Sequence, residues 1–234
     1  MLVIEKDHQL LVINQTDHAL LAGELLSLWQ RDEVPAHPRR EALLFAIREH
    51  DNGWREADAA PRVDLGTGTP YDFLSYPAHL RLEVWRQGVH RHVERQPYAS
   101  ALIIEHARHL HRGFRGDPEW DRFLKTAEEE QGELLLISGR SRQELESDWK
   151  FLRLADALSL AACGCRMEPE AAGSYSVGVE PEGLRLEPFP LVGSTTLNLL
   201  GRRIPNRPYA GDADLGTELA RAFWERFPLR FGHY

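Results

Sequence analysis

A histidine and an aspartate stand side by side at the end of an apolar helical pattern. His50 lies three and seven residues after Ile47 and Leu43, so a helix would put all three on one face. Asp51 falls one step further round the same side. An ionised carboxylate on a core-facing stripe is costly unless it is paired or binds a metal. His50 and Asp51 are therefore the first candidates for chemistry, and Gly53 is expected to end their helix.

Two further helical patterns carry a residue of the same kind inside an apolar stripe. His18 shares a face with leucines in residues 16–29, and Asp156 shares a face with leucines and a tryptophan in residues 142–162. Imidazole nitrogens and carboxylate oxygens suit divalent Fe, Mn, Zn, Ni or Mg. Hydrogen-bonded polar residues of an ordinary core are the alternative explanation. We predict four ligands of a divalent metal ion: His18, His50, Asp51 and Asp156.

The order His, His-Asp, Asp resembles the HD-domain superfamily of metal-dependent phosphohydrolases, over about residues 16–165. The run 50–54, His-Asp-Asn-Gly-Trp, is similar to the His-Asp-x-Gly of its phosphodiesterase branch. The run 153–158, Arg-Leu-Ala-Asp-Ala-Leu, looks like the usual context of the last aspartate. The chain also resembles an uncharacterised bacterial family near this superfamily. The resemblance implies an HD-type helical bundle around one or two metal ions, with Asp51 as the catalytic residue.

Two more histidines are implied by the same resemblance. In members of the superfamily with two metals, histidines between the His-Asp pair and the last aspartate bind the second ion. His79 and His106 have a similar spacing, and His106 also lies in a clear apolar stripe. If both bind, Asp51 would bridge the two ions. Four other histidines stand beside arginine or glutamate and are expected to face solvent: His90, His92, His109 and His111.

Composition narrows the class of protein. The 234 residues fit one domain over 1–234, and 42% hydrophobic with 27% charged residues is ordinary for a globular chain. A net charge of −8 argues against nucleic-acid and membrane partners, but a metal site would still admit a phosphorylated substrate. Cys163 and Cys165 are too close in the sequence for a disulfide between them to stabilise the fold. No signal peptide or membrane-spanning run is evident. We expect a cytoplasmic location.

The expected fold is mainly α, with a small antiparallel β-sheet formed by the N-terminal and C-terminal segments. The helical core covers about 16–165, and alternating apolar residues at 1–13 and 174–204 predict the sheet. An apolar stripe predicts a C-terminal helix over about 213–227. Between these elements, the Gly- and Pro-rich stretch 54–77 is expected to be a long loop, which serves either as a lid or pocket wall or as an inert surface connection.

The predicted function is metal-dependent hydrolysis of a small phosphorylated substrate by attack of a metal-bound water. The substrate class is a phosphomonoester or phosphodiester, with nucleotides among the candidates. Glu49, Asp58 and Asp72 are acid or base candidates that the sequence does not rank. Two alternatives stay open. One is a non-catalytic metal- or ligand-binding regulatory module on the same fold, and the other is a di-iron oxygenase. The sequence leaves the oligomeric state open.

Overall fold

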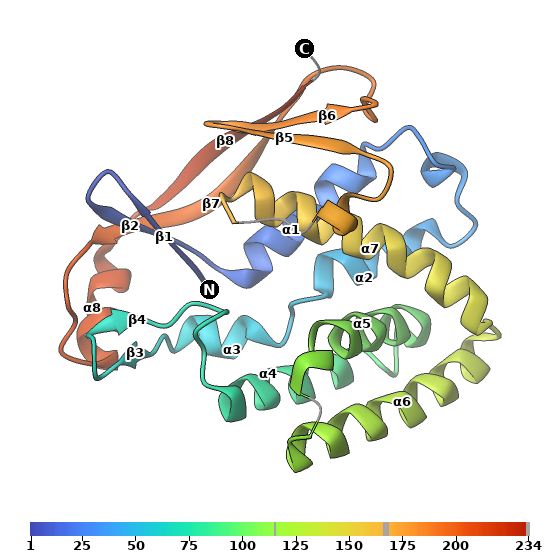
Figure 1. The fold of residues 1–234 in the computed structure, drawn as a ribbon, viewed down its shortest axis with the longest axis horizontal. Coiled ribbons are helices and arrows are strands. Elements are labelled where there is room, and N and C mark those ends of the chain that lie inside the picture. Colours follow the sequence, from blue (N-terminus) through green and yellow to red (C-terminus); the bar gives the residue numbers. More distant parts are fainter. Residues whose placement is uncertain (115, 166–168, 233–234) are drawn as a thin grey trace.

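A curled six-stranded sheet runs along the upper left of the molecule in the computed structural model, which describes residues 1–114, 116–165 and 169–232 (Figure 1). The strands lie in the order β1-β2-β7-β8-β6-β5. Neighbours are antiparallel except β6 and β8, which are parallel, so the sheet is mixed. The strands are β1 (Leu2–Lys6), β2 (Gln9–Ile13), β5 (Ser176–Glu180), β6 (Gly183–Glu187), β7 (Thr195–Pro205) and β8 (Trp224–Gly232).

This sheet overturns the prediction of a mainly α fold with a small antiparallel sheet. The predicted strands of the two ends do pair, through β2 and β7, but β8 extends the sheet beyond them. The predicted helix over 213–227 is shorter, because α8 (Asp212–Arg221) ends before β8 begins. Phe227, Leu229 and Phe231 alternate along β8, and Pro228 suits a strand better than a helix interior. The description of the chain as mainly α was therefore wrong.

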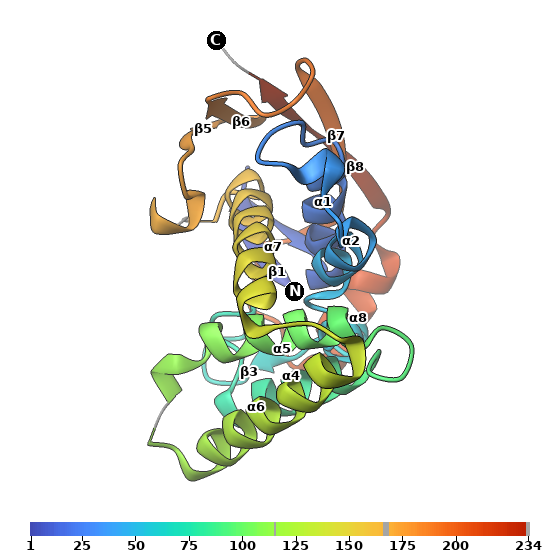
Figure 2. The same cartoon turned by 90° about the vertical axis from the view of Figure 1, so that its right-hand side faces the viewer.

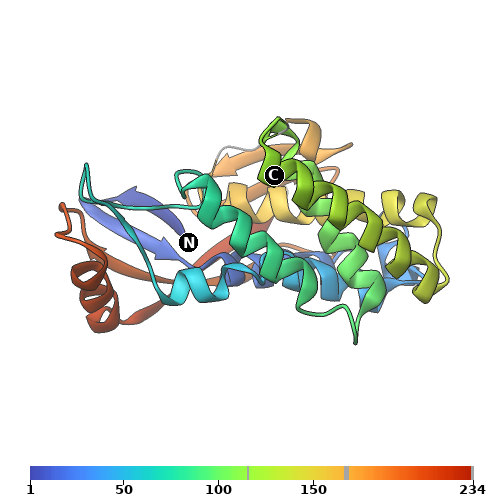
Figure 3. The ribbon, with the colours of Figure 1, turned by 90° about the horizontal axis from the view of Figure 1, so that it is seen from below.

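Helices fill the space beneath the sheet. Helix α1 contacts β7, α2 and α7, while α5 contacts α2, α4, α6 and α7 (Figure 2). Seen from below, α4 and α6 lie in front of the other helices (Figure 3). The helices of this part are α1 (Gln15–Ser27), α2 (Arg40–Glu49), α3 (Trp54–Ala59), α4 (Ala78–His90), α5 (Pro97–Leu110), α6 (Pro118–Ser138) and α7 (Arg142–Ala162).

Shorter elements link these pieces. Strands β3 (Val63–Asp64) and β4 (Thr69–Pro70) form a small antiparallel pair inside the predicted loop 54–77, which also contains α3. Single turns of 3-10 helix lie at Val34–Ala36, Arg112–Phe114 and Pro169–Ala172. In the described part of the chain, no helix is long and apolar enough to cross a membrane.

One buried ion pair fixes α2 against α7. Arg39, immediately before α2, donates from Nε and Nη2 to the two carboxylate oxygens of Asp148, each at 2.7 Å. The Asp148 side chain is fully buried, and the Tyr98 hydroxyl also donates to it at 2.7 Å. A bidentate arginine–carboxylate pair sets orientation as well as distance. The pair therefore sets the relative position of the two helices whose other ends carry His50 and Asp156.

Gly53 allows a close approach between the turn after α2 and helix α4. Its φ is −66°, so it does not occupy the left-handed conformation expected of a helix-ending glycine. A Cβ at this position would lie 2.1 Å from the carbonyl oxygen of Val84. The glycine is needed because two backbone segments approach each other closely here. The prediction that it ends the helix was wrong, because α2 ends at Glu49 with His50 as its C-terminal cap.

Candidate metal centre

Five potential metal ligands from four parts of the helical layer meet in the core. His18 lies in the first turn of α1, His50 and Asp51 directly follow α2, His106 lies on α5, and Asp156 lies on α7. Each histidine is 1% exposed, and the two aspartates are also buried. Their ligand atoms form two groups: His18 with His50 and Asp51, and His50 with His106 and Asp156. Within each group, the ligand atoms all lie within 4.8 Å of one another. These groups can hold a metal ion.

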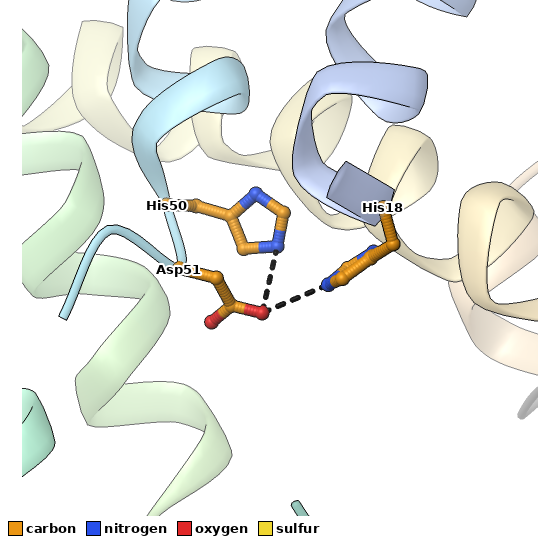
Figure 4. Close-up of side chains that lie close together, drawn as sticks. All are labelled: His18, His50 and Asp51. Carbon is orange, nitrogen blue, oxygen red and sulfur yellow. Dashed lines mark hydrogen bonds and ion pairs between the residues drawn. The ribbon is translucent and has the colours of Figure 1, made fainter. Parts of the chain in front are cut away.

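The distances between these atoms suit a coordination shell. The Nε2 atom of His18 lies 2.8 Å from Asp51 Oδ2, and that of His50 lies 3.6 Å from the same oxygen (Figure 4). His50 Nε2 is also 3.3 Å from Asp156 Oδ1, and His106 Nε2 is 3.6 Å from Asp156 Oδ2. Two atoms bound to one ion at 2.0–2.2 Å are at most about 4.4 Å apart. All four separations fall below that limit.

Hydrogen bonds fix the orientation of two of the imidazole rings. His50 Nδ1 lies 2.7 Å from the carbonyl oxygen of Ile47, so Nδ1 must carry the proton it donates. His18 Nδ1 lies 2.9 Å from the hydroxyl of Ser159, which itself donates to the carbonyl of Asp156 at 2.8 Å. The serine proton is thus used, and His18 Nδ1 is the donor. In the neutral rings, both Nε2 lone pairs face carboxylate oxygens, which is unfavourable unless a proton or a metal ion lies between them.

The charges in the cluster also favour a bound cation. Histidines supply the ion-pair partners of Asp51 and of Asp156. Burial alone would lower the pKa of His50, but the two carboxylates outweigh it and raise that pKa to about 9. Burial would raise the pKa of both carboxyl groups, yet the histidines hold each below its ordinary value. Two ionised carboxylates in the core create a strong demand for a cation.

His106 completes the cluster as a neutral ring. Burial lowers its pKa to about 4, against the opposing effect of Asp156. Among the described residues, neither of its ring nitrogens has a hydrogen-bond partner. A buried imidazole without partners is costly, and a bound cation would satisfy its Nε2 atom. His106, which its apolar stripe singled out in the sequence, thus lies in one of the two candidate ligand groups.

Two other histidines are not where the sequence put them. His79, predicted to bind a second ion, is exposed in the first turn of α4 and belongs to neither ligand group. His79 lies on the same face of α4 as buried Leu82. At the beginning of the helix, however, no neighbouring element of the described chain covers this face, so His79 remains exposed. His111, expected to face solvent, is buried. Helix α5 ends at Leu110, so helical periodicity no longer describes the direction of the next side chain.

A cavity of about 140 Å³ opens beside the cluster. Four of the five candidate ligands contribute to its wall, together with Gln15, Arg81 and His111. Burial and the neighbouring Arg81 lower the pKa of His111 to about 3, so this ring is neutral at pH 7. The remaining wall is apolar and consists of Trp54, Phe73, Leu74, Trp85, Leu110 and Leu160.

The loop between β4 and α4 covers this cavity, as predicted for a pocket wall. Arg81 donates to the carbonyl oxygens of Leu74 at 2.7 Å and Tyr76 at 2.8 Å. The backbone N–H of Phe73 donates to the carbonyl of Met1 at 3.0 Å. These bonds tie the loop both to α4 and to the start of β1. Within the stretch 54–77, Trp54 and Phe73 line the cavity, whereas Tyr71 is not among its lining residues.

The three acid or base candidates named from the sequence do not line this cavity. Glu49 binds Arg55 at 2.7 Å, and Asp58 accepts from the backbone N–H of Gln15 at 2.6 Å. Asp72 accepts from the backbone of its own loop at 2.7 Å. These hydrogen bonds hold other parts of the fold together, so we assign none of the three residues to the chemistry of the centre.

A mixed sheet with helices that bring three histidines and two aspartates together defines a candidate metal protein. The chain belongs to the family described as a protein of unknown function (DUF3891), whose model matches residues 1–200. No curated protein and no solved structure matches it. The expected membership of an uncharacterised family is thus found, while no comparison links the chain to the HD-domain superfamily. The matched region contains all five candidate ligands and ends within β7.

Proposed function

We propose that this protein is a metal-dependent hydrolase of a small phosphate ester. The observation that carries the proposal is the fixed orientation of His18 and His50, whose Nε2 atoms face buried carboxylates beside a cavity. The order of the predicted ligands resembles the HD-domain phosphohydrolases and supports the reaction class. The large mixed sheet is not the bundle that this resemblance implied, so the proposal depends on the site and not on the fold.

The geometry favours one ion instead of two. His50 uses Nδ1 to donate to a carbonyl, which leaves only Nε2 as a ligand atom. Both ligand groups need that same atom, so they describe two sides of one centre. His79, the other residue proposed for a second ion, lies outside. Asp51 is then a ligand of this single ion at the edge of the cavity. With one ion, Asp51 does not bridge two metals.

The residues around the cavity suit phosphoryl transfer to water. A divalent ion, when bound, supplies a water of lowered pKa and offsets the charge that develops on the phosphoryl oxygens. Arg81 brings a guanidinium, which remains protonated, to the cavity wall and suits a phosphoryl oxygen. The lowered pKa of His111 makes proton transfer near pH 7 inefficient, so we assign this ring to substrate binding. The covering loop limits the access of other water molecules.

The proposal is tested by metal analysis and a panel of phosphomonoesters and phosphodiesters. Protein purified without chelator should hold about one divalent ion per chain. His106→Ala should lose the ion and the hydrolysis, by more than the roughly 10–100-fold that loss of a supporting residue costs. His79→Ala is the matched control, since this exposed histidine was also predicted to bind metal, and it should keep both.

Other outcomes would point elsewhere. Wild-type protein that holds no ion and whose melting temperature does not rise with Mn²⁺ would contradict the proposal. One ion without hydrolysis of any ester would leave a metal-binding regulatory module as the better description. Two iron atoms per chain, with the absorbance and EPR signals of a coupled pair, would favour the di-iron oxygenase over the hydrolase.

A further inference from the structure

The cavity beside the metal centre is lined mainly by carbon. Beside the four candidate ligands, Gln15, Arg81 and His111, six apolar side chains line it: Trp54, Phe73, Leu74, Trp85, Leu110 and Leu160. Its volume of about 140 Å³ is close to the roughly 150 Å³ of an apolar protein cavity that accommodates benzene. The space is therefore large enough for one aryl-sized group.

The apolar walls are built on the same elements as the candidate ligands. Leu110 lies one helical turn after His106 on α5, and Leu160 lies one turn after Asp156 on α7. Side chains four residues apart on a helix are neighbours on its surface. The apolar space is thus directly next to the ligand atoms, so an apolar group held there would be attached close to the reacting phosphate.

The mouth of the cavity also carries exposed apolar surface. Leu74 is 69% exposed and Leu110 is 51% exposed, although both line the cavity. Leu74 belongs to the covering loop, whose backbone is held by Arg81. An apolar group at the mouth would remove both leucines from water, whereas a sugar there would place its hydroxyl groups against these two side chains, which offer no hydrogen bond.

We infer that the substrate is a phosphate ester with an aryl-sized apolar group next to the phosphate. This inference rests on the proposed function, since the phosphate is assigned to the metal centre. It predicts discrimination against sugar phosphates and nucleotides, whose polar groups match the walls poorly. Cyclic dinucleotides are also too large for a cavity of this volume.

The first test compares two non-hydrolysable ligands on Mn²⁺-loaded wild-type protein. Phenylphosphonate and methylphosphonate share the metal-binding group and differ only in the apolar part. Titration calorimetry should show phenylphosphonate binding at least about 10-fold more tightly, which is the low end for burial of extra apolar groups in a pocket. Equal affinities, or tighter binding of glycerol 1-phosphate than of phenylphosphonate, would overturn the inference.

Matched variants locate the effect. Leu110→Gln should lower the affinity for phenylphosphonate several-fold and leave that for methylphosphonate unchanged, because only the apolar contact is lost. Leu136→Gln is the control, since Leu136 on α6 is 82% exposed and does not line the cavity. It should change neither affinity. A variant at Leu110 that weakens both ligands equally, or neither, would show that this wall does not select the apolar group.

A metal-free arm separates this inference from the proposed function. Benzene added to metal-free protein, followed by methyl NMR signals of labelled leucines, should shift Leu110 and Leu160 and leave Leu136 unchanged. If Mn²⁺ does not bind but benzene shifts these signals, the proposed hydrolase fails and the apolar site stands. If Mn²⁺ binds and benzene shifts neither leucine, the apolar site is wrong while the metal centre stands.

Discussion

Binding of a divalent ion to the metal-free protein should release about one proton at pH 7. The carboxylates of Asp51 and Asp156 raise the pKa of His50 to about 9, so about 99% of these rings carry a proton at pH 7. Because Nδ1 donates to a carbonyl in either state, the proton that leaves is the one on Nε2. The two aspartates, whose pKa values lie below normal, and His106, with a pKa of about 4, add no further proton.

The size of the pH effect follows from this one proton. The proton on His50 competes with the ion, so affinity rises with pH and stops rising above about pH 9. One competing proton changes the apparent Kd by about tenfold per pH unit, or about 1.4 kcal/mol. From pH 6 to pH 8, Mn²⁺ should therefore bind about 100-fold more tightly through His50 alone.

Titration calorimetry in two buffers with different ionisation enthalpies measures the released protons directly. The same experiment on His79→Ala should give the wild-type proton count, because this residue lies outside the cluster. Affinity that does not change between pH 6 and pH 8, with no proton released, would refute the reasoning. It would mean either that His50 Nε2 is not a ligand or that the two carboxylates do not hold a proton on it.

Three further substitutions test how the centre is supported. Ser159→Ala should weaken metal binding by about 10–100-fold, because the His18 ring loses the partner that orients it; titration with Mn²⁺ measures this. Gly53→Ala should destabilise the protein by about 1–3 kcal/mol in urea unfolding, because its Cβ would meet the backbone of α4. Asp148→Ala should cost about 3–5 kcal/mol in the same assay, because it leaves the charge of Arg39 without its buried partner.

Each of these has a matched control. Ser100→Ala removes another buried serine, which has no hydrogen-bond partner among the described residues, and should leave metal affinity unchanged. Gly132→Ala, within α6 and with open space around its Cβ, should stabilise the helix slightly. Asp214→Ala breaks a half-exposed pair with Arg207 and should cost less than the fully buried pair. If a control substitution had the same effect as the substitution it is paired with, the contact assigned to the test residue would be unimportant.

The candidate ligands could be predicted from the sequence because the relevant signal is local. His18, His106 and Asp156 each interrupt an apolar stripe within a single helix, and burial of polar residues in such stripes is costly enough to be informative. His79 and His111 failed because both stand at helix ends. There, the periodicity of a stripe no longer shows whether a neighbouring element covers the side chain.

The sheet could not be predicted to its full size because strand pairing joins distant residues. Phe223 and Phe227 are spaced as on a helix, while Phe227, Leu229 and Phe231 are spaced as on a strand, so the pattern supports both. The choice is made by β7, which pairs with β8 along most of its length. No local pattern indicates that a strand partner will be present, and the parallel pairing of β6 with β8 gives no local signal at all.

The position of β7 in the sheet sets the order of events during synthesis. All five candidate ligands lie between α1 and α7, so they leave the ribosome before β7 does. Strand β7 then has to pair with β2, which is made before it, and β8, which is made after it, adds to the other edge of β7. Until β7 pairs with β2, the face of α1 that contacts β7 has no cover, and β2 has one unpaired edge. This interval is when a newly made chain is most exposed to aggregation with its neighbours.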